Sequence, residues 1–227
     1  MDFSCRDIAQ TIDHALLSPT LTDDALQAGC QLAMEYEVAS VCTMPFHLAQ
    51  CVQMLAGSSV RASTTIGFPH GVHTTSVKRA EAEQALDEGG QELDLVINPS
   101  RALSGGWNYV HDEIAAILEL THAAGQKLKV IFENCYLNQQ QKIRLCQIGN
   151  DLQVDWIKTS TGFGSSGATV EDVRLMAGQA TGRVEVKAAG GIRDLDTLLA
   201  LRAAGATRIG ISRTAELLDA CRRRLDL

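Results

Sequence analysis

Short apolar runs rich in β-branched residues alternate along the whole chain with longer segments whose apolar residues recur every three or four positions. The short runs predict buried strands and the longer segments predict amphipathic helices. No linker or low-complexity segment interrupts the alternation, so we expect one domain over residues 1–227, with an α/β fold and a parallel sheet. The predicted strands are 11–16, 40–44, 62–67, 93–98, 128–133, 156–159, 184–188 and 208–212.

Several of the intervening segments carry helix start and stop signals. Thr22 and Asp194 are suited to cap the first turn of a helix, whereas Gly125 and Gly205 are suited to end one. One segment repeats apolar residues on a single face: Val110, Ile114, Ile117 and Thr121. Eight strand–helix units in 227 residues fit a (β/α)₈ TIM barrel better than an open doubly wound sheet.

Composition and charge narrow the class of protein. The chain is 45% hydrophobic and 21% charged, and its net charge of -7 lacks the basic face that nucleic-acid binding needs. We find no apolar run of about 18 residues and no signal-peptide pattern near the N-terminus, so we expect no membrane association and a cytoplasmic location. The seven cysteines are scattered without a C-x-x-C pair, which favours reduced thiols.

Metal-binding patterns are weak in this sequence. His70 and His73 are close together, but they flank Gly71 in a predicted loop, where helical i,i+4 geometry does not apply. We therefore expect no metal site, and no motif implies a cofactor.

Polar and ionisable residues gather at the predicted strand ends, where a TIM barrel carries its active site. In chain order these positions are Asp13, Cys42, the turn 67–69, Asp94, Asn98, Glu133, Lys158, Lys187 and Ser212. A carboxylate or ammonium inside an apolar strand needs a partner or a chemical role. A mutually neutral buried cluster is the alternative interpretation, and either lysine alone would more often be structural.

Two segments share one design, a strand that ends in lysine and then runs into glycines: residues 155–164 and 184–193. Two lysines with a carboxylate fit Schiff-base catalysis, because a lysine amine must lose its proton before it attacks a carbonyl. A second cation would favour that loss: two unit charges about 4 Å apart repel by about 4 kcal/mol at an effective dielectric of about 20. Asp94 would then serve as the general acid or base of an aldol reaction.

The loops after the last three predicted strands are rich in glycine. In this barrel such loops recurrently bind phosphate through backbone N–H groups. Each glycine pair is a weak signal alone, but together they predict a phosphorylated substrate. The candidate phosphate-binding residues are Gly162, Gly190, Gly191, Gly210 and Ser212.

Nearly the whole chain resembles the deoxyribose-phosphate aldolases. The resemblance rests on residues 11–14 (TIDH), 40–42 (SVC), 66–69 (IGFP), 92–98 (ELDLVIN), 158–163 (KTSTGF), 187–193 (KAAGGIR) and 205–210 (GATRIG). It implies a (β/α)₈ barrel without a metal that reversibly joins acetaldehyde to glyceraldehyde 3-phosphate to give 2-deoxyribose 5-phosphate. By resemblance, Lys158 forms the Schiff base, Lys187 lowers its pKa and joins the proton relay, Asp94 relays protons, and Asp13 supports that relay. The five glycine-loop residues match the phosphate site.

The chain departs from this family pattern at Ser18, Met44 and Arg213, and its tail, 222–227, lacks the terminal tyrosine that some members use. These departures leave open a related aldolase with a shifted aldehyde or sugar-phosphate preference. A sugar-phosphate isomerase or epimerase on the same fold and a non-catalytic sugar-phosphate sensor are further alternatives. Many small barrels of this kind dimerise, so a homodimer is also an expectation.

Overall fold

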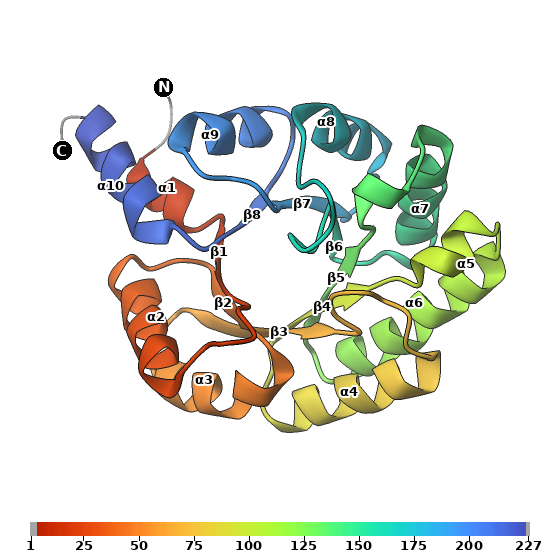
Figure 1. Ribbon diagram of the computed structural model, residues 1–227, viewed down its shortest axis with the longest axis horizontal. Coiled ribbons are helices and arrows are strands. Elements are labelled where there is room, and N and C mark those ends of the chain that lie inside the picture. The colour runs from red at the N-terminus through yellow and green to blue at the C-terminus, as the bar shows by residue number, and fades with distance from the viewer. Residues whose placement is uncertain (1–3, 226–227) are drawn as a thin grey trace.

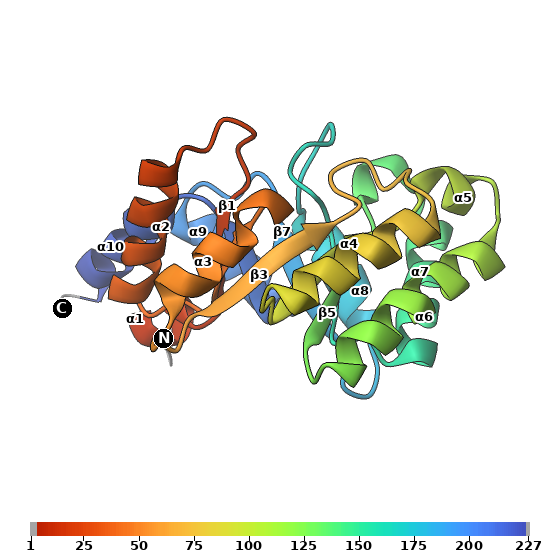
Figure 2. The same cartoon turned by 90° about the horizontal axis from the view of Figure 1, so that it is seen from below.

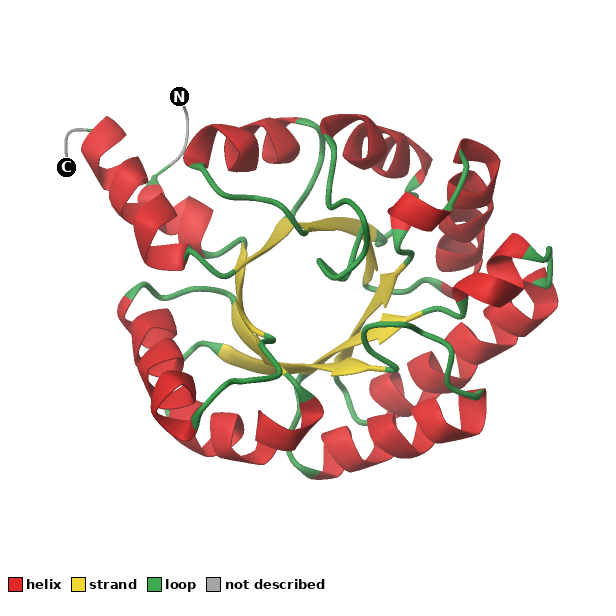
Figure 3. Cartoon of the chain, in the orientation of Figure 1, coloured by secondary structure: helices red, strands yellow, loops and turns green. Residues whose placement is uncertain are grey.

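The computed structural model describes residues 4–225 and consists of a closed barrel of parallel strands surrounded by helices. The strands pair in chain order, and β1 pairs with β8 to close the barrel. Figure 3 shows the ring of strands inside the ring of helices. The strands are β1 Ile12–Leu16, β2 Ser40–Thr43, β3 Arg61–Ile66, β4 Glu92–Val96, β5 Lys127–Ile131, β6 Trp156–Lys158, β7 Glu185–Ala189 and β8 Arg208–Ile211. The predicted (β/α)₈ barrel is confirmed.

The helices follow the strands around the outside of the barrel (Figure 1). They are α1 Cys5–Ala9, α2 Asp23–Glu35, α3 Leu48–Leu55, α4 Thr75–Asp87, α5 Pro99–Leu103, α6 Trp107–Ala123, α7 Gln139–Leu152, α8 Val170–Gln179, α9 Leu195–Ala203 and α10 Thr214–Arg224, with short 3₁₀ turns η1 Pro45–His47 and η2 Asn134–Tyr136. Two predicted caps are confirmed: Thr22 Oγ1 accepts from the Ala25 N–H, and Asp194 Oδ1 accepts from the Thr197 N–H.

The apolar core lies between the strands and the helices. All five residues of β4 are buried, and because side chains alternate across a strand, Leu93 and Leu95 face the helices while Glu92 and Asp94 face the barrel interior. The barrel interior is therefore polar at the level of Glu92 and Asp94. On the predicted helical face of α6, Val110, Ile114, Ile117 and Thr121 are all buried.

Strand register sets two pairs of charged residues side by side inside the barrel. Lys158 of β6 is paired with Lys187 of β7, and Asp94 of β4 is paired with Lys129 of β5. Parallel neighbours in register place their side chains on the same face of the sheet. Figure 2 shows that the loops after β1, β3 and β6 rise from one end of the barrel, which is the end toward which these strands run.

Candidate active site

One carboxylate stands between the two lysines that the sequence singled out. Asp94 Oδ2 accepts from Lys158 Nζ and from Lys187 Nζ, each at 2.6 Å. Its other oxygen, Oδ1, accepts from Lys129 Nζ at 2.9 Å. All four side chains are buried, so these charge-assisted hydrogen bonds are little screened by water. The structure thus brings together Asp94, Lys158 and Lys187 as predicted.

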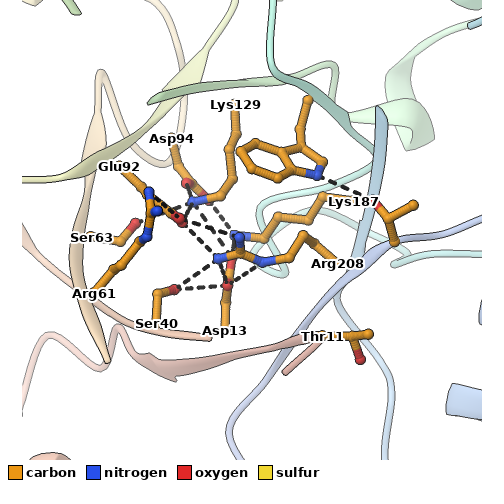
Figure 4. A network of polar contacts seen from close by, with 12 residues as sticks. Thr11, Asp13, Ser40, Arg61, Ser63, Glu92, Asp94, Lys129, Lys187 and Arg208 are labelled. Carbon is orange, nitrogen blue, oxygen red and sulfur yellow. Dashed lines mark hydrogen bonds and ion pairs between the residues drawn. The ribbon is translucent and has the colours of Figure 1, made fainter. Parts of the chain in front are cut away.

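Asp13 joins the same cluster from β1. Its Oδ2 lies 2.5 Å from Lys187 Nζ, while Oδ1 accepts from Ser40 Oγ at 2.7 Å and from the Arg208 guanidinium. The sequence predicts Asp13 at the end of its strand; this prediction is wrong, because Asp13 is the second residue of β1. It lies deeper in the barrel and reaches the lysines through its side chain (Figure 4).

Three charged residues of the cluster were missed by the sequence analysis: Lys129, Glu92 and Arg208. Lys129 Nζ lies 2.5 Å from Glu92 Oε2 and 3.6 Å from Asp13 Oδ2, and Arg208 Nη2 lies 2.7 Å from Glu92 Oε2. Figure 4 shows the side chains of Glu92 from β4, Lys129 from β5 and Arg208 from β8 converging in the barrel interior. Charged residues within the apolar segments 92–98 and 128–133 were the available signal, since an interior-facing position would demand partners.

The surroundings of Lys158 and Lys187 shift the pKa values of these two lysines in opposite directions. Burial lowers the pKa of Lys158; Asp94 acts in the opposite direction, and the Lys187 cation adds to the lowering. Burial also opposes the charge of Lys187, but the Asp13 and Asp94 carboxylates outweigh it, so the pKa of Lys187 is raised. The second cation that the sequence predicts does lower the pKa of Lys158, but burial is the larger cause.

Asp94 is held as a carboxylate. Burial favours its neutral acid, but Lys129, Lys158 and Lys187 outweigh burial, so the pKa of Asp94 is lowered. The Lys158 amine, with its lowered pKa, therefore lies beside the Asp94 carboxylate and the Lys187 ammonium. Such a set can attack a carbonyl, stabilise an iminium and move protons.

A cavity of about 410 Å³ opens above this cluster at the mouth of the barrel. The Lys158 and Lys187 side chains form part of its floor, and Cys42 and Ser18 also line it. The predicted phosphate-binding residues all line the same cavity: Gly162, Gly190, Gly191, Gly210 and Ser212. The structure therefore joins the candidate reactive groups and the candidate phosphate site in one space.

Two glycines show why the cavity wall needs this residue: Gly190 in the loop after β7 and Gly210 within β8. Gly190 has φ of 87°, and a Cβ added there would lie 3.0 Å from the Gly167 Cα and 3.2 Å from the Gly162 Cα. A Cβ on Gly210 would lie 3.0 Å from the Ala189 Cβ and 3.5 Å from the Lys187 Cε. Glycine therefore allows the loops to pack closely and leaves room beside the second lysine.

Glu133 holds the loop that follows the candidate reactive lysine. It lies just after β5 in the left-handed region, with φ of 56°, and is nearly buried. Its carboxylate accepts from the Thr161 N–H at 3.3 Å and from the Thr161 hydroxyl. This contact fixes the β6–α8 loop immediately before Gly162.

The departures from the family pattern lie at different distances from the cavity. Ser18 lines it, whereas Met44 precedes η1 and is not among its lining residues. Arg213 caps α10, is exposed, and lies 3.3 Å from Glu216 through its Nη1 atom. It also lines an adjoining hollow together with Arg193 and Ser212. The last two tail residues, 226–227, lie outside the described residues.

Residues 4–225 contain neither a candidate metal cluster nor a helix suited to span a membrane. No three His, Cys, Asp or Glu side chains are grouped as a potential metal site in this part of the chain. Among the same residues, none of the helices has the length and apolar character required to cross a bilayer.

Proteins of known identity resemble the chain over its full length. A deoxyribose-phosphate aldolase of Rhodopirellula baltica is 59% identical over 226 residues, which is 100% of this chain and 94% of that protein. A deoxyribose-phosphate aldolase of Thermococcus gammatolerans is 41% identical, covering 95% of this chain and 97% of its own.

Solved structures agree with these sequence matches. An aldolase named QR15 is 37% identical, with a TM-score of 0.91, over 97% of this chain and 99% of its own. A deoxyribose phosphate aldolase from Aeropyrum pernix, described as a unique tetramer, is 30% identical, with a TM-score of 0.89, over 96% of this chain and 92% of its own.

A family model described as DeoC/LacD family aldolase matches residues 8–214, a range that includes all eight strands. The resemblance that the lysine motifs indicated is thereby confirmed. The chain belongs to the DeoC/LacD family of aldolases.

Proposed function

We propose that this chain is a 2-deoxy-D-ribose-5-phosphate aldolase, a lyase that reversibly cleaves its substrate to acetaldehyde and D-glyceraldehyde 3-phosphate through a Schiff base. One observation carries the proposal: Lys158, whose pKa is lowered, opens onto the cavity at the barrel mouth beside Asp94 and the cationic Lys187. A buried lysine with both an accessible face and an acid–base partner meets the requirements for attack on an aldehyde.

The chemistry begins with the open-chain aldehyde of the sugar. The Lys158 amine attacks C1, water leaves, and an iminium forms between the Nζ atom and C1. Loss of the proton on the C3 hydroxyl then breaks the C2–C3 bond, and the electron pair of that bond forms the enamine. Protonation of C2 and hydrolysis release acetaldehyde and return the amine.

Asp94 and Lys187 are suited to move these protons. Asp94 Oδ2 contacts both lysine nitrogens, so a proton taken from the substrate can be passed along a chain of short hydrogen bonds. Asp13 supports that chain by contacting Lys187 on its other side. Lys187 keeps its charge because the carboxylates raise its pKa, and it can therefore stabilise developing negative charge.

The other end of the cavity suits the 5-phosphate. Gly162, Gly190, Gly191, Gly210 and Ser212 line this cavity, and the left-handed conformation of three of these glycines turns their backbone into tight loops. Backbone N–H groups in such loops bind anions. The 5-phosphate would thereby orient C1 toward Lys158.

The test is a borohydride trap followed by intact mass. An aldolase of this class incubated with acetaldehyde and borohydride gains one reduced adduct and cleaves 2-deoxyribose 5-phosphate. A sugar-phosphate isomerase or epimerase, or a non-catalytic sensor, gains no adduct, and this result would reject the proposal. An adduct accompanied by faster cleavage of another sugar phosphate would indicate a shifted substrate preference, for which Ser18 in the cavity wall is the structural basis.

Assembly and location complete the proposal. We infer a homodimer that acts in the cytoplasm, where phosphorylated sugars are retained. The A. pernix relative is described as a tetramer, so size-exclusion chromatography with light scattering should distinguish a dimer from a tetramer or a monomer.

A further inference from the structure

Glu92 and Arg208 form an ion pair deep in the barrel, below the residues that face the cavity. The Arg208 guanidinium donates to Glu92 through Nη1 at 3.2 Å and Nη2 at 2.7 Å, and to Asp13 through Nε at 2.9 Å. Its central carbon stacks 4.9 Å from the centre of the Trp156 ring. Neither Glu92 nor Arg208 lines the cavity, so neither is placed to touch the substrate.

These two residues belong to a buried charge cluster that has one more base than acid. The acids are Asp13, Glu92 and Asp94, and the bases are Lys129, Lys158, Lys187 and Arg208. If every group were ionised, the barrel interior would hold an unbalanced positive charge away from water. Such a charge is costly in a buried site. Neutrality is reached when one base is unprotonated.

Lys158 is the base that the contacts leave least supported. Its ion-pair partner is Asp94, which it shares with Lys129 and Lys187. Lys187 also contacts Asp13, and Lys129 also contacts Glu92. For Lys129, burial opposes its charge, but Asp13, Asp94 and Glu92 outweigh burial and raise its pKa. The cluster therefore releases its proton at Lys158 first.

Other ionisable groups around the cluster do not change this count. Burial raises the pKa of the Cys42 thiol on β2, and burial lowers the pKa of His14 on β1 to about 4, so both are uncharged at neutral pH. Arg61 on β3 lies 3.8 Å from Glu92, but it is half exposed and screened by water. Glu185 on β7 is exposed and accepts from the Thr207 hydroxyl.

We propose that Glu92 and Arg208 are positioning residues that set how readily the Lys158 amine loses its proton, with Arg208 favouring the loss and Glu92 opposing it. The inference rests on the proposed function, because an unprotonated amine matters only if Lys158 attacks a carbonyl. Each member acts through the charge that it adds to the cluster, so the two members act with opposite signs.

The direction in which Glu92 acts on Lys158 can be tested with a substitution that preserves the shape of the side chain. Glu92→Gln removes one negative charge and keeps an oxygen that can accept from Lys129 and Arg208. The extra positive charge should make Lys158 release its proton more readily, so the acid limb of the rate profile should move to lower pH. We expect a movement of about one pH unit, the effect of a unit charge roughly 10 Å away at an effective dielectric of about 20.

Two double variants separate charge from geometry. Glu92→Gln with Arg208→Gln restores the original net charge, so its acid limb should return to the wild-type position. Glu92→Gln with Arg208→Lys keeps the added positive charge, so its limb should remain shifted. Both variants lack the Glu92 carboxylate, so neither leaves it unpaired beside Asp13 when Arg208 is changed. Thermal melts identify the folded fraction, to which every rate is normalised.

The measurement is the pH dependence of reductive trapping with acetaldehyde and cyanoborohydride, together with kcat/KM for cleavage, from mildly acidic to mildly alkaline pH. On the acid limb, Glu92→Gln should be trapped about tenfold faster than wild type. The inference is overturned if the acid limb of Glu92→Gln stays at the wild-type pH or moves to higher pH. It is also overturned if adding Arg208→Gln does not bring the limb back to the wild-type pH. If wild type gives no adduct at all, the proposed function fails instead.

Discussion

Lys78 and Lys158 are both buried and bonded to a carboxylate, yet of these two only Lys158 opens onto the cavity. Lys78 of α4 lies outside the ring of strands, with its Nζ atom 2.9 Å from Glu113 Oε1 and 2.8 Å from the Val96 carbonyl oxygen. Lys158 lies inside the barrel, 2.6 Å from Asp94 Oδ2. Burial is the largest influence on both lysines, and it lowers the pKa of each.

The difference between the two lysines lies in access and in shared partners. A Cβ added to Gly67 would lie 2.7 Å from the Lys78 Cε, so backbone seals that ammonium on one side. Glu113 also accepts from the Asn98 N–H at 3.0 Å, and the pair therefore ties α4 and α6 to the end of β4. Lys158, by contrast, faces the cavity and shares its carboxylate with Lys187. A depressed pKa alone does not identify a reactive lysine.

Removal of the carboxylate that pairs with each lysine should affect catalysis at Lys158 but not at Lys78. Asp94→Asn should lower cleavage by about 100-fold to 10,000-fold, because the proton relay loses its acid–base group. Schiff-base trapping should persist, and raising the pH should not restore turnover. The measurement is kcat alongside the trapping rate across the pH range. Glu113→Gln is the matched control and should affect stability instead; full turnover in Asp94→Asn would contradict the proposed relay.

Removal of the second lysine should have the next largest effect. Lys187→Leu deletes one of the influences that lower the pKa of Lys158, so more of that amine is protonated at neutral pH. Activity at neutral pH should fall by up to about 1,000-fold and recover partly as pH rises. Because burial remains, some of the depression should persist. Lys187→Arg should keep the acid limb near its wild-type position but lose activity, since the charge sits on a longer, planar group.

The shapes of the pH profiles decide this prediction. A Lys187→Leu profile that is the wild-type profile scaled down would mean that the Lys187 charge does not act on Lys158. Lys187 would then have to act in proton transfer or in structure.

Substitutions in the Lys78–Glu113 pair should change the stability of the fold rather than catalysis. Lys78→Met leaves the Glu113 carboxyl buried without its cation, which should lower the free energy of unfolding by about 3–5 kcal/mol. Denaturant melts measure this loss, and Lys78→Met combined with Glu113→Leu should recover much of it. The folded fraction of Lys78→Met should form the adduct at the wild-type rate. A lower trapping rate in folded Lys78→Met would contradict the distinction between a structural Lys78 and a reactive Lys158.

How far the site could be predicted depended on where each charge lies along its strand. Lys158, Lys187 and Asp94 stand in or beside apolar, β-branched runs followed by turn residues, and such local signals were sufficient. Glu92 and Arg208 open their strands, where the sequence alone does not tell an interior residue from one at the wet rim. Lys129 was missed because its partners come from other strands and depend on the closed register.

The burial of Lys78 and of Lys158 could not be predicted for another reason, because it depends on tertiary packing. Lys78 occurs in a polar helix segment that reads as solvated, and only the packing of α4 against α6 buries it. The depth at which Lys158 is buried is likewise a property of the closed barrel. The sequence could therefore indicate a neighbouring cation but not the larger effect of burial.

The smallest expected effect concerns the rim of the phosphate site. Arg213 is exposed and lies beside Ser212, so Arg213→Ser should raise KM for the 5-phosphate only a few-fold, as expected for a screened surface charge. The rate kcat should stay unchanged, and the effect should weaken with salt. Arg222→Ser, on the same helix and away from the cavity, is the matched control. A KM increase that is equal for unphosphorylated deoxyribose would show that Arg213 does not recognise the phosphate.

The most direct test of the distinction between the lysines is peptide mapping after acetaldehyde is trapped with borohydride on the wild-type protein. The proposed mechanism predicts that the added mass lies on Lys158, with Lys78, Lys129 and Lys187 unmodified. Lys158→Met should abolish the label without transferring it to a neighbour. A label on any of the other three buried lysines, or no label at all, would contradict the assignment of Lys158 as the Schiff-base residue.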